Sequence, residues 1–253
     1  MGQLAGRRAL VTGGGRGIGR AVALALGAAG ADVAVTYVRD EDAAAHTVAS
    51  IEELGRRARA YRASIADAGE TDAAVASAVA DLGGLDLVVS NAGIASRGRT
   101  VVDTDPAELE RVLRVHALGP HRLAQVALPH LRRAPRSDLV FVSSIAAHTA
   151  PPGGAPYTMG KAAVEALART LAREEAGHGV HVNVVAPGLV DTEMGFRLAR
   201  ATVGAADLRE LDGRSPYGHV CSADEVAEAV LFLVSAGYVN GHRVVVDGGA
   251  GGF

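Results

Sequence analysis

Short, almost continuous apolar runs alternate with longer helical stretches along nearly the whole chain. The runs are rich in Val, Leu and Ala and lack a two-residue alternation, as expected of strands buried on both faces. Alternating strands and helices imply right-handed crossovers, and therefore a doubly wound α/β fold with a parallel sheet and helices on both faces. Seven strands are predicted at 8–12, 32–37, 59–64, 85–90, 138–143, 181–186 and 243–246, and the main helices at 19–29, 41–54, 70–82, 106–133, 156–176 and 224–235.

The chain shows no internal repeat, low-complexity linker or shift in composition, so a single domain over residues 1–253 is expected. Residues 189–218 break the alternation, because their pattern is helical only in pieces. An insertion after a late strand, at the carboxyl side of the sheet, suits a lid over a substrate. An ordinary surface excursion is the alternative.

Charge and hydropathy exclude several kinds of partner. The net charge of −3, with charges interspersed, gives no electrostatic footprint for nucleic acid. No apolar run approaches the roughly 20 residues of a membrane-spanning helix. Cys221 is the only cysteine and has no partner for an internal disulfide, which fits a reducing compartment. We therefore expect a cytoplasmic protein, and no metal site.

A glycine-rich segment, residues 12–19, follows the first predicted strand and opens the first helix. Glycines let the backbone turn sharply and approach a pyrophosphate, whose charge then faces the positive end of the helix. The spacing is G-x-x-x-G-x-G, and its position between strand and helix favours a nucleotide site over a plain tight turn. The predicted contacts are Gly13, Gly15, Arg16, Gly17, Ile18 and Gly19.

The end of the second strand indicates which dinucleotide is bound. An acidic residue there would favour NAD, and an arginine would favour the 2′-phosphate of NADP. The strand ends at Tyr37 and is followed by Arg39, while the acidic residues 40–42 are expected to open the next helix. Arg16 and Arg39 are both placed to reach a phosphate. NADP(H) is therefore predicted, with NAD(H) as the alternative.

Lys161 is the only lysine among 25 basic residues, and it lies four residues after Tyr157. On a helix this spacing places both side chains on one face. A free phenol has a pKa of about 10, and a neighbouring ammonium lowers it toward the range useful for acid–base chemistry. Arginine does not release its proton as lysine does, so a chain that otherwise uses only arginine is expected to need lysine chemistry here.

Together these motifs resemble the short-chain dehydrogenase/reductase family over essentially the whole chain, which implies a Rossmann fold. Ser144, 13 residues before Tyr157, completes a Ser, Tyr-x-x-x-Lys arrangement. The resemblance implies that Tyr157 protonates a carbonyl oxygen, that Ser144 hydrogen-bonds it, and that Lys161 holds the nicotinamide ribose. It also implies cofactor contacts from Asn91, Ala92 and Gly93 after the fourth strand, and from Pro187, Gly188, Val190 and Thr192.

Two positions depart from the family pattern. His116 replaces an asparagine whose main-chain carbonyl helps to hold a water in a proton relay behind the lysine, so His116 is a candidate catalytic residue. A buried, hydrogen-bonded histidine is favoured over one that titrates in the relay. Ser64-Ile65 stands where the family often has Asp-Val beside the adenine, and weaker adenine binding is one possible consequence.

The leading hypothesis is an NADPH-dependent reductase of a small-molecule ketone, similar to the 3-oxoacyl-(acyl-carrier-protein) reductase branch. The alternatives are an NAD(P)-dependent alcohol or sugar dehydrogenase and a non-catalytic nucleotide-binding sensor. Family members of this size are commonly tetramers, so a homotetramer is expected, with a homodimer as the alternative. The predicted substrate contacts are Ser144, His148, Leu189 and Met194, with His148 more favoured as a rim residue than as an acid–base group.

Overall fold

Seven parallel strands form one sheet in the computed structural model, which describes residues 2–215 and 217–250. Their order across the sheet is β3-β2-β1-β4-β5-β6-β7, so the direction of winding reverses between β1 and β4. This confirms the α/β fold with a doubly wound parallel sheet. The strands are β1 (Arg8–Val11), β2 (Asp32–Tyr37), β3 (Ala58–Arg62), β4 (Leu87–Ser90), β5 (Ser137–Val142), β6 (Val180–Pro187) and β7 (Arg243–Val246).

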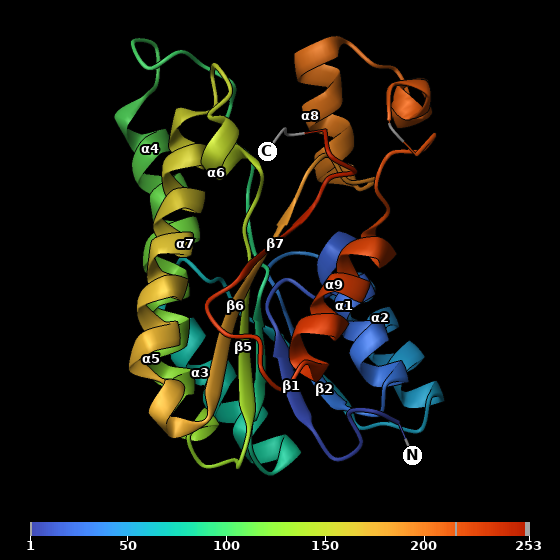
Figure 1. The fold of residues 1–253 in the computed structure, drawn as a ribbon, viewed down its shortest axis with the longest axis vertical. Helices are drawn as coiled ribbons and strands as arrows, with labels where there is room; N and C mark the ends of the chain where they lie inside the picture. Colours follow the sequence, from blue (N-terminus) through green and yellow to red (C-terminus); the bar gives the residue numbers. More distant parts are fainter. Residues whose placement is uncertain (1, 216, 251–253) are drawn as a thin grey trace.

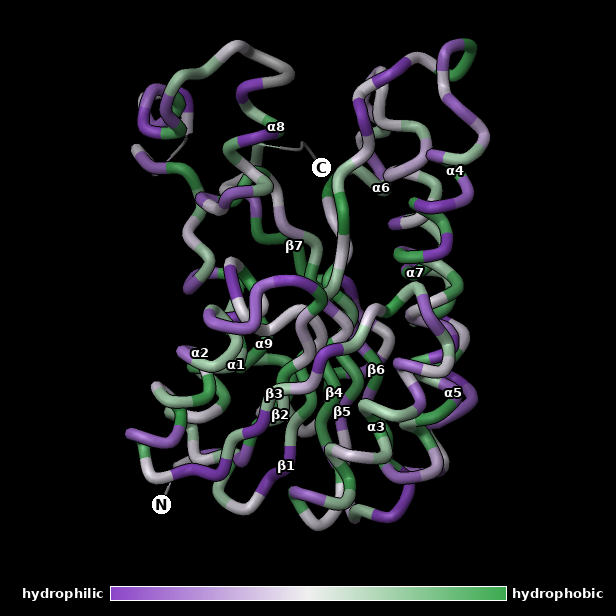
Figure 2. Tube along the Cα trace, turned by 180° about the vertical axis from the view of Figure 1, so that it is seen from behind, coloured by the Kyte–Doolittle hydropathy of each residue, from purple (hydrophilic) through white to green (hydrophobic). Residues whose placement is uncertain are grey.

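Helices cover both faces of the sheet, as predicted (Figure 1). On one face lie α1 (Gly17–Ala28), α2 (Glu41–Glu53) and α9 (Ala223–Ser235). On the other lie α3 (Ala68–Leu82), α5 (Gly119–Leu131) and α7 (Ala155–Glu174). Each face has its own core of small apolar side chains, and Figure 2 shows the strands between them as mostly hydrophobic. Among the helices of the described residues, none is long and apolar enough to cross a membrane.

The predicted helix 106–133 is interrupted. It comprises α4 (Pro106–Leu113), a π-helical turn η1 (Arg114–Leu118) and α5. A Cβ at Gly119 would lie 2.2 Å from the Ile65 carbonyl oxygen, and one at Gly160 would lie 2.6 Å from the His116 Cβ. The wide turn therefore coincides with two close contacts to neighbouring elements, and it carries His116. Such π-turns are frequent at functional sites.

Residues 189–218 form α8 (Glu193–Val203) and a 3₁₀ segment η3 (Leu208–Arg214), with a small core of their own around Ala199, Ala205 and Leu208. Thr192 begins α8 by accepting a hydrogen bond from the Gly195 amide at 3.1 Å. This unit lies beyond the carboxyl ends of the strands (Figure 1). Its function as a lid stays a prediction. The short helices α6 (Ala146–Thr149) and η2 (Ala176–His178) were not expected from the sequence.

Candidate active site

The carboxyl ends of β1 and β4 are joined by a compact hydrogen-bond network. The Thr12 hydroxyl accepts from the amides of Asn91 and Ala92, both at 3.0 Å. The Asn91 side-chain amide in turn donates to the carbonyl oxygens of Thr12 at 3.0 Å and Gly13 at 3.3 Å. In open α/β sheets, ligands bind in the crevice where the strand order reverses. The first glycine turn and the segment after β4 are thus fixed to each other at this crevice.

The glycine loop leaves room for a phosphate to approach its backbone. Gly13 and Gly17 have φ of 67° and 52°, in the left-handed region that favours glycine. A Cβ at Gly19 would lie 2.1 Å from the Gly13 carbonyl oxygen and 2.5 Å from Asn91 Nδ2. Within residues 2–215 and 217–250, no side chain caps the amino end of α1. Its first amides are therefore suited to an anionic group, and the loop fits a dinucleotide pyrophosphate.

Gly19→Ala is expected to abolish dinucleotide binding, because the added methyl meets backbone and the Asn91 amide, neither of which is a flexible side-chain end. The measurement is titration of NADPH fluorescence with purified protein. Gly177→Ala is the matched control, since a Cβ there meets nothing within 4 Å. Wild-type affinity in the Gly19 variant would show that the loop does not hold the pyrophosphate.

The end of β2 carries no carboxylate. Asp40 instead caps α2 by accepting from the Ala43 amide at 3.0 Å, and Glu41 and Asp42 lie in the first turn of that helix, as predicted. Arg39 is exposed and makes no side-chain hydrogen bond or ion pair within the described ranges. Arg16 Nη1 lies 2.6 Å from Glu193 Oε2 at the start of α8, and its contact with a phosphate stays a prediction. The glycine loop and the 189–218 unit are therefore linked by an exposed ion pair.

Tyr157, Lys161 and Ser144 come together at the carboxyl ends of β5 and β6. The first two lie one turn apart on α7, and the Lys161 Nζ is 5.5 Å from the centroid of the Tyr157 ring. The Ser144 hydroxyl accepts from the Ala146 amide at 3.1 Å and acts on the Tyr157 phenol as a hydrogen-bonding neighbour that lowers its pKa. The Lys161 ammonium, which is buried, donates to the Val142 carbonyl at 2.7 Å.

Burial changes the acid–base properties of this cluster in a direction that the sequence did not predict. It raises the pKa of Tyr157 to about 12, and the hydrogen bond with Ser144 only partly offsets this. Burial lowers the pKa of Lys161 to about 8, against a raising effect of Glu165. The expected lowering of the phenol pKa is therefore wrong for this structure, since burial raises this pKa and outweighs the opposing effect of Ser144. At neutral pH the phenol holds its proton.

His116 is buried in η1, directly against Tyr157. Its ring meets the tyrosine ring edge to face, with centroids 5.1 Å apart. Nε2 lies 2.7 Å from the Ile94 carbonyl oxygen and 3.2 Å from the Ile94 amide. Burial, together with the charge of Lys161, lowers the pKa of His116 to about 3. The imidazole is thus neutral at physiological pH, which favours the packed histidine over the titrating one. A role for its main-chain carbonyl in a relay stays a prediction.

Several predicted contact residues have side chains that are engaged within the protein itself. The Ile65 and Val190 side chains belong to the two cores. Ser64 accepts from the Ala66 amide at 3.3 Å. Of the predicted substrate residues, Leu189 packs against the small core under α8, whereas Met194 is 40% exposed. Of the remaining predicted positions, Tyr37 and Pro187 end β2 and β6, Gly188 follows β6 directly, and Gly93 lies three residues after β4.

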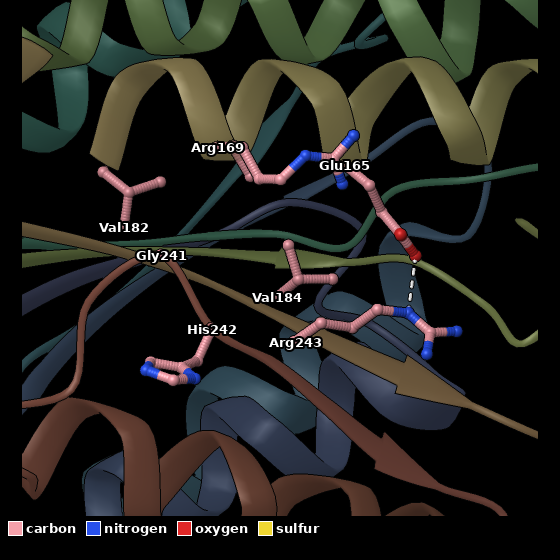
Figure 3. Close-up of a pocket in the computed structure, with 8 residues that line it drawn as sticks. Glu165, Arg169, Val182, Val184, Gly241, His242 and Arg243 are labelled. Carbon is pink, nitrogen blue, oxygen red and sulfur yellow. Dashed lines mark hydrogen bonds and ion pairs between the residues drawn. The ribbon is translucent and has the colours of Figure 1, made fainter. Parts of the chain in front are cut away.

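One member of the site was missed. Glu165 is buried on α7, and its carboxylate is hydrogen-bonded to Ser143 and His148 and paired with Arg243. Figure 3 shows the contact with Arg243. His148 is therefore tied by Nε2 to a carboxylate, with its side chain 59% exposed. The spacing 157, 161 and 165 was a usable signal, because it continues the face of α7 that carries the tyrosine and the lysine.

The sheet order and the glycine crevice define a dinucleotide-binding α/β protein. A family model described as Enoyl-(Acyl carrier protein) reductase matches residues 13–251. Versicolorin reductase stcU of Emericella nidulans is 37% identical, over 98% of this chain and 97% of its own length. Tetrahydroxynaphthalene reductase of Pyricularia oryzae is 35% identical, over 98% and 90%. A crystal structure of a short chain dehydrogenase from Burkholderia cenocepacia J2315 in complex with NADP superposes with a TM-score of 0.88 at 36% identity, over 97% of this chain and 98% of that one.

The chain therefore belongs to the short-chain dehydrogenase/reductase family, as the motifs indicated.

Proposed function

We propose that this protein is an oxidoreductase that reduces a ketone to an alcohol with NADPH. The observation that carries the proposal is the convergence of Tyr157, Ser144 and Lys161 beside the glycine crevice. The reductase names of the relatives and the NADP in the Burkholderia structure support the direction and the cofactor. A non-catalytic sensor would not need this combination of groups.

The proposed chemistry uses each group according to its protonation state. When bound, NADPH supplies the hydride to the carbonyl carbon. The Tyr157 phenol, protonated at neutral pH, donates its proton to the carbonyl oxygen. The Ser144 hydroxyl donates a hydrogen bond to the same oxygen while negative charge develops there. The Lys161 ammonium stabilises the phenolate left behind and passes a proton to it, and the Lys161 amine that remains then takes a proton from solvent.

The proposal is tested by following NADPH oxidation with a panel of ketones. Aromatic and hydroxylated ring ketones come first, because of the relatives named above. The expected result is turnover of at least one ketone. Faster oxidation of alcohols or sugars would favour the dehydrogenase alternative. Turnover of an enoyl thioester alone would show that the protein reduces a C=C bond and not a ketone. Tight NADPH binding with no turnover of any of these substrates would favour a sensor.

Arg39 is proposed to hold the 2′-phosphate of NADPH. It is exposed just beyond β2 and has no ionic partner in the part of the chain that the structure describes, whereas Arg16 must share its charge with Glu193. We expect Arg39→Ala to raise KM for NADPH roughly tenfold, the cost of about one charge-assisted hydrogen bond, and to leave KM for NADH nearly unchanged. Steady-state kinetics with both cofactors measure this. Equal effects on the two would argue against a 2′-phosphate contact.

Two further properties are proposed on the family resemblance. The protein is expected to act in the cytoplasm and to assemble as a homotetramer or homodimer. Large apolar side chains exposed on η1, α9 and β7 support assembly: they are Leu118, Phe232 and Val245. These side chains mark a subunit interface only where they join into one apolar patch, since single exposed apolar residues are common on monomers.

A further inference from the structure

We infer that Glu165 is the positioning residue of this site: its buried carboxylate keeps the Lys161 ammonium charged and fixes the loop that carries Ser144. The inference rests on the proposed function for its kinetic consequences, but not for its structural ones. Glu165 lies one turn after Lys161 and two turns after Tyr157 on α7. It is therefore the third member of a single helical face.

Three hydrogen bonds hold the Glu165 carboxylate. Oε1 accepts from the Ser143 hydroxyl at 2.7 Å and from Arg243 Nε at 2.9 Å, while Oε2 lies 2.8 Å from His148 Nε2. Figure 3 shows Glu165 reaching down from α7 toward Arg243 on β7. The Glu165 side chain is only 3% exposed. A carboxylate this buried is retained only with such partners, because an unpaired charge would be costly.

Glu165 holds the chain on both sides of Ser144. Ser143, the preceding residue, also donates weakly to the Lys161 carbonyl at 3.4 Å. His148 belongs to α6, which begins two residues after Ser144. A serine that must hydrogen-bond a developing oxyanion needs a fixed position. The hydrogen bonds of Ser143 and His148 with Glu165 give Ser144 this fixed position, which also explains why His148 faces a carboxylate.

Lys161 needs the same carboxylate for its charge. Its ammonium is buried, and it donates a hydrogen bond to a neutral carbonyl oxygen, that of Val142. Burial disfavours the ammonium, and the negative charge of Glu165 opposes this loss. The other titratable or charged groups facing the pair are His116 from η1, Tyr157 and Arg169 from α7, His148 from α6, and His242 and Arg243 from the chain at β7.

The single lysine allows a direct test. Protein labelled with ¹³C-lysine gives one Cε resonance, whose pH titration reports Lys161 alone, in the full chain. We expect a midpoint near the pKa of about 8 for wild type and a lower one for Glu165→Gln. The pH profile of kcat/KM for a ketone should move the same way, since the activity is lost as pH rises through the pKa of Lys161. Above that midpoint, each unit of downward shift costs about tenfold.

Glu175→Gln is the matched control. Glu175 caps the end of the same helix, is equally buried and is paired with Arg132 at 2.6 Å, at the opposite end of α7 from Tyr157. Loss of the Glu175 charge should lower the melting temperature of the protein and leave the pH midpoint of the Lys161 titration unchanged. If Glu165→Gln does not fold, Glu165→Asp withdraws the carboxylate by one methylene, and its Lys161 midpoint should still fall.

The inference would be overturned if the pH midpoint of the Lys161 titration were the same in wild type and in the folded Glu165 variant. Absence of ketone turnover in wild type would instead count against the proposed function, and the NMR titration would still decide whether Glu165 holds the lysine charge. The two failures are therefore distinguishable.

Discussion

Tyr157→Phe is expected to stop ketone reduction while leaving NADPH binding intact. The substitution removes the proton donor but keeps the ring that packs edge to face against His116. General acid catalysis by a positioned side chain contributes roughly 10²- to 10⁴-fold, so a loss of kcat of about this size is expected. Steady-state kinetics measure the loss, and fluorescence titration of NADPH measures binding. The buried ring should keep the variant folded.

Tyr61→Phe is the control for this substitution. The Tyr61 hydroxyl, on β3, donates to Asp81 at 2.8 Å. It is outside the Tyr157–Lys161–Ser144 cluster, so removing it should leave kcat near the wild-type value. If Tyr157→Phe behaved like this control, the phenol would not be the proton donor and the assignment of the site would fail.

The parts of the fold that depend on burial pattern were predictable. Strands such as β2 and β5 are buried along most or all of their length, and this produces apolar runs that are visible in the sequence. The π-turn that carries His116 was not predictable, because it depends on how closely Gly119 approaches Ile65 across the fold. The helical periodicity of residues 106–133 does not report contacts with residues elsewhere in the chain.

The proximity of Tyr157 and Lys161 was predictable, whereas the electrostatics around them were not. The spacing of Tyr157 and Lys161 gives their proximity, but the degree of burial that raises the phenol pKa and lowers the ammonium pKa is a property of the packed structure. Glu165 was overlooked for a related reason. A carboxylate on a helix is usually solvated, and its burial becomes reasonable only when Arg243, far along the chain, is seen beside it.

Lys161→Arg is expected to lower kcat by at least about 10²-fold although the positive charge is kept. The ammonium occupies a buried position with one carbonyl acceptor, that of Val142. A guanidinium has five donors and a rigid planar fork, so most of its donors would lack acceptors there. It also does not release a proton, so it could not re-protonate the Tyr157 phenolate. Kinetics with saturating NADPH separate this loss from weaker ribose binding.

Arg173→Lys is the reciprocal control, because Arg173 is exposed in the last turn of the same helix. It should leave kcat unchanged, since an exposed cation of either type is solvated. A chain with 24 arginines and one lysine then shows at a single position why the two are not equivalent. At the surface only charge matters, whereas behind Tyr157 the cation must fit a small buried space and exchange a proton. Wild-type activity in Lys161→Arg would show that neither the fit of the cation nor proton exchange is needed, and the proposed role of the only lysine would then be wrong.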